Sequence, residues 1–150
     1  MKAKTEELDE VLHSSIAALT KAGDAYVESG KYDLALEKYR EAFGLLPAPF
    51  EKWEAATWIL TAIADTLFSK AEYERARETL QQAMRCPGAI GNPFLHLRLG
   101  QAQLEMKNIE RAKDELARAY MGGGDEIFKG EDPKYLRFIK EILRPREDDL

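Results

Sequence analysis

The sequence predicts an all-α fold in which the helices form short antiparallel pairs. Two observations lead to this prediction: apolar residues recur at helical spacing along nearly the whole chain, and short breaks containing glycine or proline separate these segments. A third observation is internal similarity, because three segments carry the same order of small and large apolar residues. A chain of 150 residues is long enough for one domain with its own core.

The breaks define the expected helices in chain order. Thr5 is expected to cap the first helix and Gly30 to end it. Asn92 and Asp132, each followed by proline, are expected to cap the fifth helix and the last one. The expected ranges are about 6–29, 32–45, 51–69, 72–85, 93–106, 109–121 and 133–143.

The segment MGGGDEIFKGED, which follows the sixth helix, is expected to be a loop whose glycines end that helix. Ile127 and Phe128 in this loop are expected to pack under the last helix. Cys86 is the single cysteine, and we interpret it as a small buried apolar residue.

Three segments share one pattern of small and large residues. Each places a small residue on its first helix, and an alanine followed by a large apolar residue on its second helix. A side chain at the small position would push the two helices apart, so we expect a close helix crossing there. The small residues are Gly23, Ala64 and Gly100, the alanines are Ala35, Ala76 and Ala112, and the large residues are Tyr39, Leu80 and Leu116.

This pattern resembles the tetratricopeptide repeat (TPR), and the resemblance covers about residues 16–126. It implies a right-handed α-solenoid of three helix pairs, with the last helix as a cap on the stack. The implied single domain spans 1–150, with repeats at about 16–49, 57–90 and 93–126. The small residues are 41 and 36 positions apart instead of about 34, so the solenoid is expected to be locally irregular.

The resemblance also implies that the first helix of each pair lines a concave groove that binds other proteins. On a helical wheel of residues 53–68, Trp53 falls in the core arc with Ile59 and Ile63, whereas Trp58 falls in the arc that faces the groove. We therefore expect Trp53 to be buried and Trp58 to be at least partly exposed.

The same arc supplies the candidate partner-binding residues of all three repeats. They are Asp24, Glu28, Trp58, Thr61, Asp65, Phe68, Phe94, Gln101 and Glu105. Aromatic side chains beside carboxylates favour a basic protein partner. For Phe68 and Phe94 a second interpretation stays open, in which they pack between adjacent repeats.

Other classes of function are not indicated. The net charge of −5 disfavours nonspecific nucleic-acid binding, and no apolar run approaches the roughly 20 residues that cross a bilayer. His13 and His96 have no ligand partners at metal spacing, and neither a nucleophile motif nor a phosphate-binding loop occurs. We therefore expect no metal, no cofactor and no enzyme activity. The N-terminus MKAKTEELDE has no apolar signal core, which favours a cytoplasmic location.

One kind of TPR partner is also disfavoured. TPR domains that hold the C-terminal carboxylate of heat-shock chaperones need Lys and Asn at groove positions of the first helices. Asp24, Asp65 and Gln101 stand at such positions here, and two carboxylates would repel a third.

The chain also resembles small free-standing bacterial TPR proteins that are encoded beside polymorphic toxins and serve as immunity proteins. The resemblance lies in EKWEAATWILTAIADTLF, CPGAIGNPFLHLRLGQ and YMGGGDEIFKGEDPKYLRFIKEIL. It implies that the protein binds and neutralises a toxin domain, which we expect to be basic. Two alternatives stay open: a secretion-type chaperone that holds a segment of an exported protein, and a self-assembling TPR scaffold.

Overall fold

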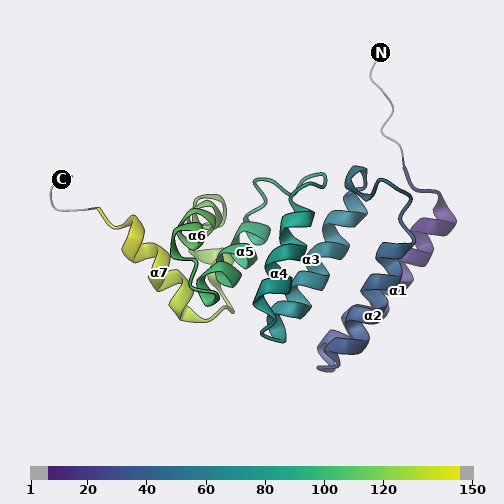
Figure 1. Cartoon of the computed structure of the whole chain (residues 1–150), viewed down its shortest axis with the longest axis horizontal. Coiled ribbons are helices and arrows are strands. Elements are labelled where there is room, and N and C mark those ends of the chain that lie inside the picture. The colour runs from purple at the N-terminus through teal and green to yellow at the C-terminus, as the bar shows by residue number, and fades with distance from the viewer. Residues whose placement is uncertain (1–6, 146–150) are drawn as a thin grey trace, which may run out of the picture.

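The computed structural model describes residues 7–145 and places them in a row of helix pairs (Figure 1). Within these residues the chain forms only helices and two 3-10 turns, without a strand. The elements are α1 (Glu10–Glu28), α2 (Tyr32–Gly44), η1 (Phe50–Lys52), α3 (Glu54–Ser69), α4 (Tyr73–Ala83), α5 (Pro93–Glu105), α6 (Ile109–Gly123), η2 (Gly124–Phe128) and α7 (Pro133–Leu143). The predicted all-α fold of three helix pairs and a last single helix is confirmed. No helix among these elements is long and apolar enough to cross a membrane.

The first helix begins later than the sequence predicted. Asp9 is its N-cap, and the Asp9 Oδ1 atom accepts a hydrogen bond of 2.9 Å from the backbone N–H of Leu12. A carboxylate suits this position, because it satisfies a free N–H and lies at the positive end of the helix dipole. The predicted cap, Thr5, lies outside the described residues.

The third helix also begins later, at Glu54 rather than near residue 51. The residues before it form the separate 3-10 turn η1, in which the Phe50 ring packs against the Phe43 ring with centroids 5.0 Å apart. Trp53 follows this turn in extended conformation, and its indole N–H donates a hydrogen bond of 2.7 Å to the Pro47 carbonyl. These tertiary contacts hold the segment outside the helix.

The prediction of a plain loop after residue 121 is wrong. Helix α6 continues to Gly123, and η2 follows directly, with Gly124 at a positive φ of 61°. Ile127 and Phe128 of η2 are buried beside Tyr135 and Ile139 of α7, as expected. Burial of Ile127 and Phe128 thus stabilises the 3-10 turn η2, whereas the glycines before it had suggested only the end of a helix.

The predicted close crossings are present. A Cβ atom built on Gly23 would lie 2.5 Å from Cε1 of Tyr39, and one on Gly100 would lie 2.6 Å from Cγ of Leu116. Ala64 and Leu80, the equivalent pair in the second repeat, are both fully buried. Small residues therefore set the distance between the helices of each pair.

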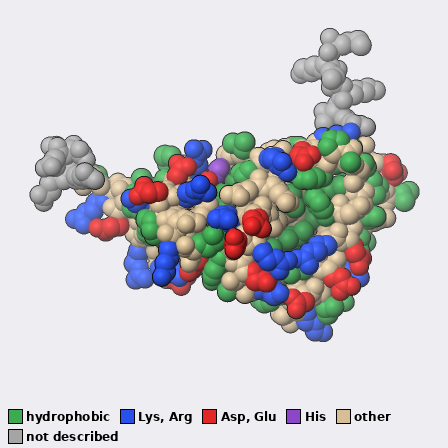
Figure 2. Space-filling model, in the orientation of Figure 1, with side chains coloured by type: hydrophobic (Ala, Val, Ile, Leu, Met, Phe, Trp, Pro, Cys, Tyr) green, Lys and Arg blue, Asp and Glu red, His purple; other side chains and the backbone are tan. Residues whose placement is uncertain are grey.

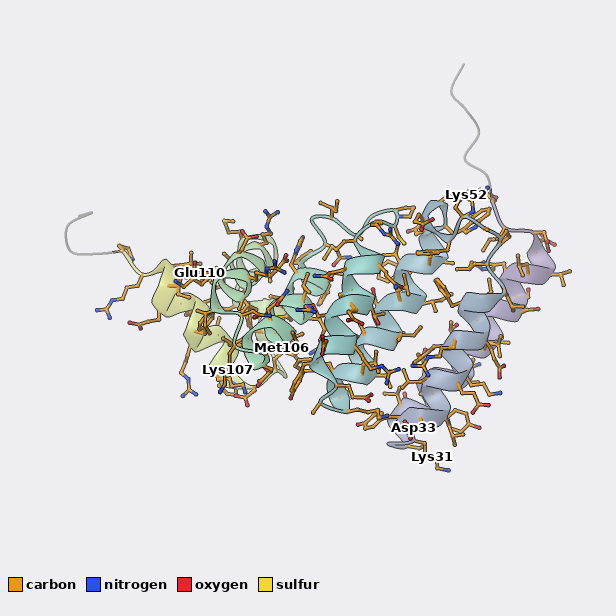
Figure 3. All side chains as sticks on the ribbon, in the orientation of Figure 1. Lys31, Asp33, Lys52, Met106, Lys107 and Glu110 are labelled. Atoms are coloured by element: carbon orange, nitrogen blue, oxygen red, sulfur yellow. The ribbon has the colours of Figure 1, made fainter. Side chains whose placement is uncertain are left out.

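All three helix pairs share one turn geometry at the end of the first helix. The residue after the cap adopts a left-handed conformation, with φ of 72° at Gly30, 60° at Ala71 and 65° at Lys107. The next N–H then bonds to a carbonyl five residues back, as in Lys31 to Tyr26 and Asn108 to Gln103. Lys31 and Asp33 lie at one edge of the solenoid in Figure 3, and Lys52 lies at the other.

The packing between neighbouring repeats is uneven. Leu36 directly follows the small alanine of α2 and is buried against Ile59 and Ile63 of α3. Arg77 holds the same place in α4, and its Nε is buried without a hydrogen-bond partner among the described residues. The junction of the second and third repeats therefore holds an arginine with one unsatisfied N–H where the previous junction holds leucine, although the Arg77 side chain is partly exposed and its Nη2 lies 3.8 Å from Glu74.

Cys86 is buried, and its thiol donates a hydrogen bond of 3.6 Å to the Gln82 carbonyl. Burial raises the pKa of this thiol, which keeps it protonated and agrees with a packing role.

Candidate functional site

The nine predicted partner-binding residues lie on α1, α3 and α5, the first helices of the three pairs. We call the surface formed by these nine residues the A-helix face. Its two ends differ, because Asp24 and Glu28 on α1 are exposed whereas Gln101 on α5 is fully buried.

The two tryptophans separate as the helical wheel predicted. Trp53 is 6% exposed and Trp58 is 56% exposed. Phe94, the second residue of α5, is 64% exposed, so it does not pack between repeats. Two large aromatic side chains are therefore available to a partner on this side of the molecule.

Of the two exposed acids that α1 contributes to the A-helix face, Asp24 accepts a hydrogen bond from another side chain. Its Oδ1 accepts a bond of 2.5 Å from the Tyr39 hydroxyl, and burial together with this bond raises the pKa of Tyr39, so the phenol stays a donor. No basic side chain pairs with Asp24 or Glu28 among the described residues. The charge of α1 is therefore not balanced by an ion pair on this surface.

The second and third repeats are joined by a partly buried ion network centred on Arg98. Its Nε donates to Asp65 at 2.8 Å, and its Nη1 donates to Glu131 at 2.6 Å and to the Gln101 side-chain oxygen at 2.7 Å. Burial lowers the pKa of Arg98, but Asp65 and Glu131 outweigh this effect and raise it. Arg98 is therefore a permanent cation between two carboxylates.

Phe68 lies beneath this network. The Arg98 guanidinium carbon is 4.8 Å from the centroid of the Phe68 ring, and the Tyr73 ring is 5.2 Å away. Phe68 is half-buried, so the packing interpretation applies to it, in contrast to Phe94. A cation over an aromatic face adds to the stability of the junction.

Gln101 cannot contact a partner directly, which corrects the prediction. Its side-chain N–H donates to Glu131 at 2.8 Å while its oxygen accepts from Arg98, so the amide is used on both sides. Leu97, one turn earlier, is buried with Phe128 and Tyr135. The chain's own residues after η2 therefore cover this part of the A-helix face.

Glu105 is also engaged within the chain. It accepts a hydrogen bond of 2.6 Å from the Tyr135 hydroxyl and forms an ion pair with Lys134, both on α7. Burial raises the pKa of Glu105, but the bonds from Lys134 and Tyr135 outweigh this effect and lower it below its usual range. Glu105 therefore holds the capping helix on α5.

Thr61 contributes little polar surface. Its hydroxyl donates a bond of 2.6 Å to the Thr57 carbonyl of the preceding turn, and the residue is half-buried. Because the hydroxyl already donates its proton within the helix, Thr61 can offer a partner only the free lone pairs of that oxygen and an apolar methyl group.

The face is thus less acidic than its sequence indicated. Asp65 and Glu105 are paired with cations, and only the α1 end keeps exposed carboxylates without a basic partner. On the side of the molecule drawn in Figure 2, acidic and basic side chains are interspersed rather than gathered in a field of one sign.

Metal chemistry has no site in the described residues, where no group of three or more potential ligands gathers. His13 is exposed, and His96 is buried with its Nδ1 2.6 Å from Glu115. Because the Gly91 N–H donates to His96 Nε2, the Nδ1 atom carries the proton and donates to Glu115.

Two open pockets lie away from the A-helix face, between α4 and α6. They have volumes of about 420 Å³ and 500 Å³ and share Glu110 and Arg111 in their linings. Their linings mix both charge signs, which does not favour one class of ligand.

Comparison with known proteins identifies the architecture. Residues 16–48 match the family model described as tetratricopeptide repeat. The C-terminal TPR-containing domain of a putative FK506-binding protein from Plasmodium falciparum superimposes with a TM-score of 0.70, at 16% identity over 92% of both chains. The chain has the tetratricopeptide-repeat fold.

Two other TPR structures are similar. One is the first TPR domain of Spaghetti (RPAP3) bound to the HSP90 peptide SRMEEVD, with a TM-score of 0.65 and 18% identity over 87% of this chain and 94% of that domain. The other is PcrH from Pseudomonas aeruginosa, with a TM-score of 0.68 and 13% identity over 95% of this chain and 99% of PcrH.

A curated relative is the Hsp70-Hsp90 organizing protein of Triticum aestivum. It is 30% identical over 154 residues, which covers 97% of this chain and 26% of the wheat protein. The chain therefore spans about a quarter of the length of this relative.

Sequence reasoning missed Arg98 and Glu131, the two residues that close the third-repeat part of the TPR surface. Arg98 stands two positions before Gly100, where the second repeat has Ala62 and the first has Lys21. The change from Ala62 to Arg98 at equivalent positions of neighbouring repeats could have indicated that Arg98 has a special role. Glu131 gave none, because it lies between η2 and α7, outside the repeat pattern.

Proposed function

We propose that this protein is a binding protein rather than an enzyme, and that it binds another polypeptide through the exposed part of its A-helix face. The observation that carries this proposal is the exposure of Trp58, which is 56% accessible on a helix whose other large side chains are mostly buried. A tryptophan at the centre of an interface can contribute about 2–4 kcal/mol when it is buried by a partner.

The proposal has support from the architecture. A similar TPR domain is described with a bound peptide, which indicates that this fold can hold a polypeptide on its surface. The acidic peptide of that complex is not a good candidate here, because Asp24 and Asp65 would repel its carboxylates.

We further propose that the partner is a toxin domain and that the protein is its immunity protein. This proposal rests on the resemblance to TPR immunity proteins and on the net charge of −5, which favours encounter with a basic toxin. Binding would neutralise the toxin by covering its active site or a surface that it needs.

The test is co-expression of this chain with the toxin domain encoded by a neighbouring gene. An immunity protein restores growth and co-purifies with the folded toxin in a 1:1 complex. The Trp58→Ala variant is expected to weaken that complex at least about tenfold, since truncation of a central aromatic residue removes interface burial. Ile90→Ala is the matched control, because Ile90 is also an exposed apolar residue, at 76%, but lies in the α4–α5 connection. The absence of both rescue and complex contradicts the immunity proposal.

A secretion-type chaperone is the second candidate, and the peptide held by a similar TPR domain favours it. A chaperone would bind an unfolded segment of its client as tightly as the folded client. Titration of the purified protein with both forms of one partner separates the two proposals, because an immunity protein requires the folded domain.

A further inference from the structure

The A-helix face consists of a closed part and an open part. The third-repeat part is closed by the chain's own Glu131, Lys134 and Tyr135, which occupy the polar groups of Arg98, Gln101 and Glu105. A partner that bound there would have to displace α7 and leave Arg98 without its second carboxylate. Because the charged groups of the closed part are already paired within the chain, this part is not expected to bind either an acidic or a basic ligand.

The open part lies on α1 and α3. Asp24 and Glu28 are exposed, Trp58 is largely exposed, and the Asp65 side chain is 48% exposed although it bonds to Arg98. Asp24 and Asp65 stand at equivalent positions of neighbouring repeats, because each directly follows the small residue of its first helix. Two carboxylates therefore flank one small region of the surface.

The repeats explain why the negative charge persists on this side. Arg98 of α5 reaches back to Asp65 of α3, but Ala62 stands at the equivalent place on α3 and cannot reach back to Asp24. Lys21, which is exposed on α1, forms no ion pair in the described part of the chain. The Asp24 side of this region therefore has no cation paired with it among the described residues, whereas Asp65 shares Arg98 with Glu131.

The spacing of these groups limits the ligand. Trp58 and Asp65 are seven residues apart on α3, which corresponds to about 10 Å along the helix axis. An extended chain covers that length with about three residues. A partner could therefore bury an apolar side chain at Trp58 and place a cation between the carboxylates only if the two lie about three residues apart.

We propose that the α1–α3 part of the A-helix face binds an extended partner segment in which an aromatic or aliphatic residue precedes or follows a Lys or Arg by three or four positions. The apolar side chain packs on Trp58, and the cation lies between Asp24 and Asp65. This inference rests on the proposed polypeptide-binding function and specifies the chemistry of its ligand.

The test uses three capped peptides of equal length titrated into the ¹⁵N-labelled protein. GFSSKG carries the proposed spacing, GFSSEG reverses the charge, and GFKSSG shortens the spacing. With GFSSKG, the indole N–H signal of Trp58 is expected to shift, whereas that of Trp53, which is buried and bonded to Pro47, stays in place. GFSSEG is expected to bind at least about fivefold more weakly, because like charges meet at the acidic region, and GFKSSG is expected to lie between them.

Variants complete the design. Asp24→Asn is expected to reduce the preference for GFSSKG over GFSSEG, and Asp65→Asn to do the same. Glu126→Gln is the matched control, because Glu126 is an exposed acid whose single ion pair in residues 7–145 is with Lys129, away from this surface. An unchanged preference in both aspartate variants overturns the proposal.

Other outcomes also decide the matter. Equal binding of GFSSEG, shifts confined to α7, or no shift with any peptide each overturns the proposed ligand chemistry. None of these results touches the co-expression test with a folded toxin, so the failure of this inference and the failure of the proposed function are told apart.

Discussion

At Gly23 and Gly100, the absence of a side chain allows the first helix of a pair to approach the second. The ring of Tyr39 and the branched end of Leu116 occupy the space where a Cβ atom would lie. Tyr39 also binds Asp24 through its hydroxyl, so the same contact that packs the first repeat orients an acid on its surface. At this scale, packing and the proposed binding surface depend on one tyrosine.

We predict that Gly23→Ala destabilises the protein by about 1–3 kcal/mol, because the buried Tyr39 ring must move to accept the added methyl group. Urea unfolding followed by circular dichroism measures the change. Gly44→Ala is the matched control, since no atom lies within 4 Å of an added Cβ there and alanine favours a helix. Equal stability of wild type and Gly23→Ala would show that the two helices are not in the close contact described.

At the scale of the helix, the turns between paired helices have one geometry but not one residue. Glycine is suited to a left-handed turn, yet Ala71 and Lys107 occupy this position in the second and third repeats. A side chain in the left-handed conformation costs about 1–2 kcal/mol relative to glycine, part of which is offset by the greater freedom of glycine in the unfolded chain.

We predict that Lys107→Gly stabilises the protein by about 0.5–1 kcal/mol, because it removes this backbone strain at the end of α5. Thermal and urea unfolding measure the gain. Lys113→Gly, in the interior of α6, is expected to destabilise by about 1 kcal/mol, since glycine is a poor helix former there. A loss of stability in Lys107→Gly would contradict the assigned turn.

The capping helix gives a pH-dependent prediction. The folded protein lowers the pKa of Glu105 through Lys134 and Tyr135, so this stabilisation is present above the unfolded pKa of about 4.3 and is lost as the pH falls through the folded value. Glu105→Gln is therefore expected to be less stable than wild type at pH 7, with a difference that shrinks toward pH 3.

Urea midpoints at several pH values check this expectation. Glu126→Gln is the control, because its exposed ion pair with Lys129 contributes little. A Glu105→Gln difference that stays constant down to pH 3 would exclude a role for the ionised carboxylate.

The helix pattern was predictable because it depends on periodicity and on strong breaks. Helices α2, α4, α5 and α7 lie within a few residues of their expected ranges. The starts of α1 and α3 were less predictable. For α1, the sequence offers both Thr5 and Asp9 as possible caps. For α3, the contacts of Phe50 and Trp53 hold the preceding residues outside the helix. Such tertiary contacts leave no periodic signal.

At the scale of the whole molecule, the same limit applies to the candidate site. Angular position separated Trp53 from Trp58, because burial on a helix follows its period. Angular position failed for Gln101 and did not foresee the pairing of Glu105, since residues about 30 positions later in the chain cover them. A residue that faces away from its own helix pair is exposed only if no later element packs on it.

The Arg77 Nε, which is buried without a hydrogen-bond partner among the described residues, has a consequence for how the solenoid opens. Stability in repeat proteins is approximately a sum over repeats and their nearest-neighbour junctions. A junction that loses more stability through Arg77 than it gains from the contacts of Arg98 with Asp65 and Phe68 therefore divides the chain into units that can exchange with solvent separately. We predict that native-state hydrogen exchange detects two such units, residues 10–83 and 93–143, with lower free energies of opening than global unfolding.

Arg77→Leu should merge the two units into one and raise the stability by about 1 kcal/mol, since it replaces an unsatisfied buried N–H by the side chain that the first junction uses. Arg75→Leu, at a half-exposed arginine paired with Glu72, should leave the exchange pattern unchanged. Uniform exchange in the wild type would contradict the division. If it holds, the half that carries Trp58 and the half that carries α7 fluctuate independently, and a partner held by the first does not lower the amide exchange of the second.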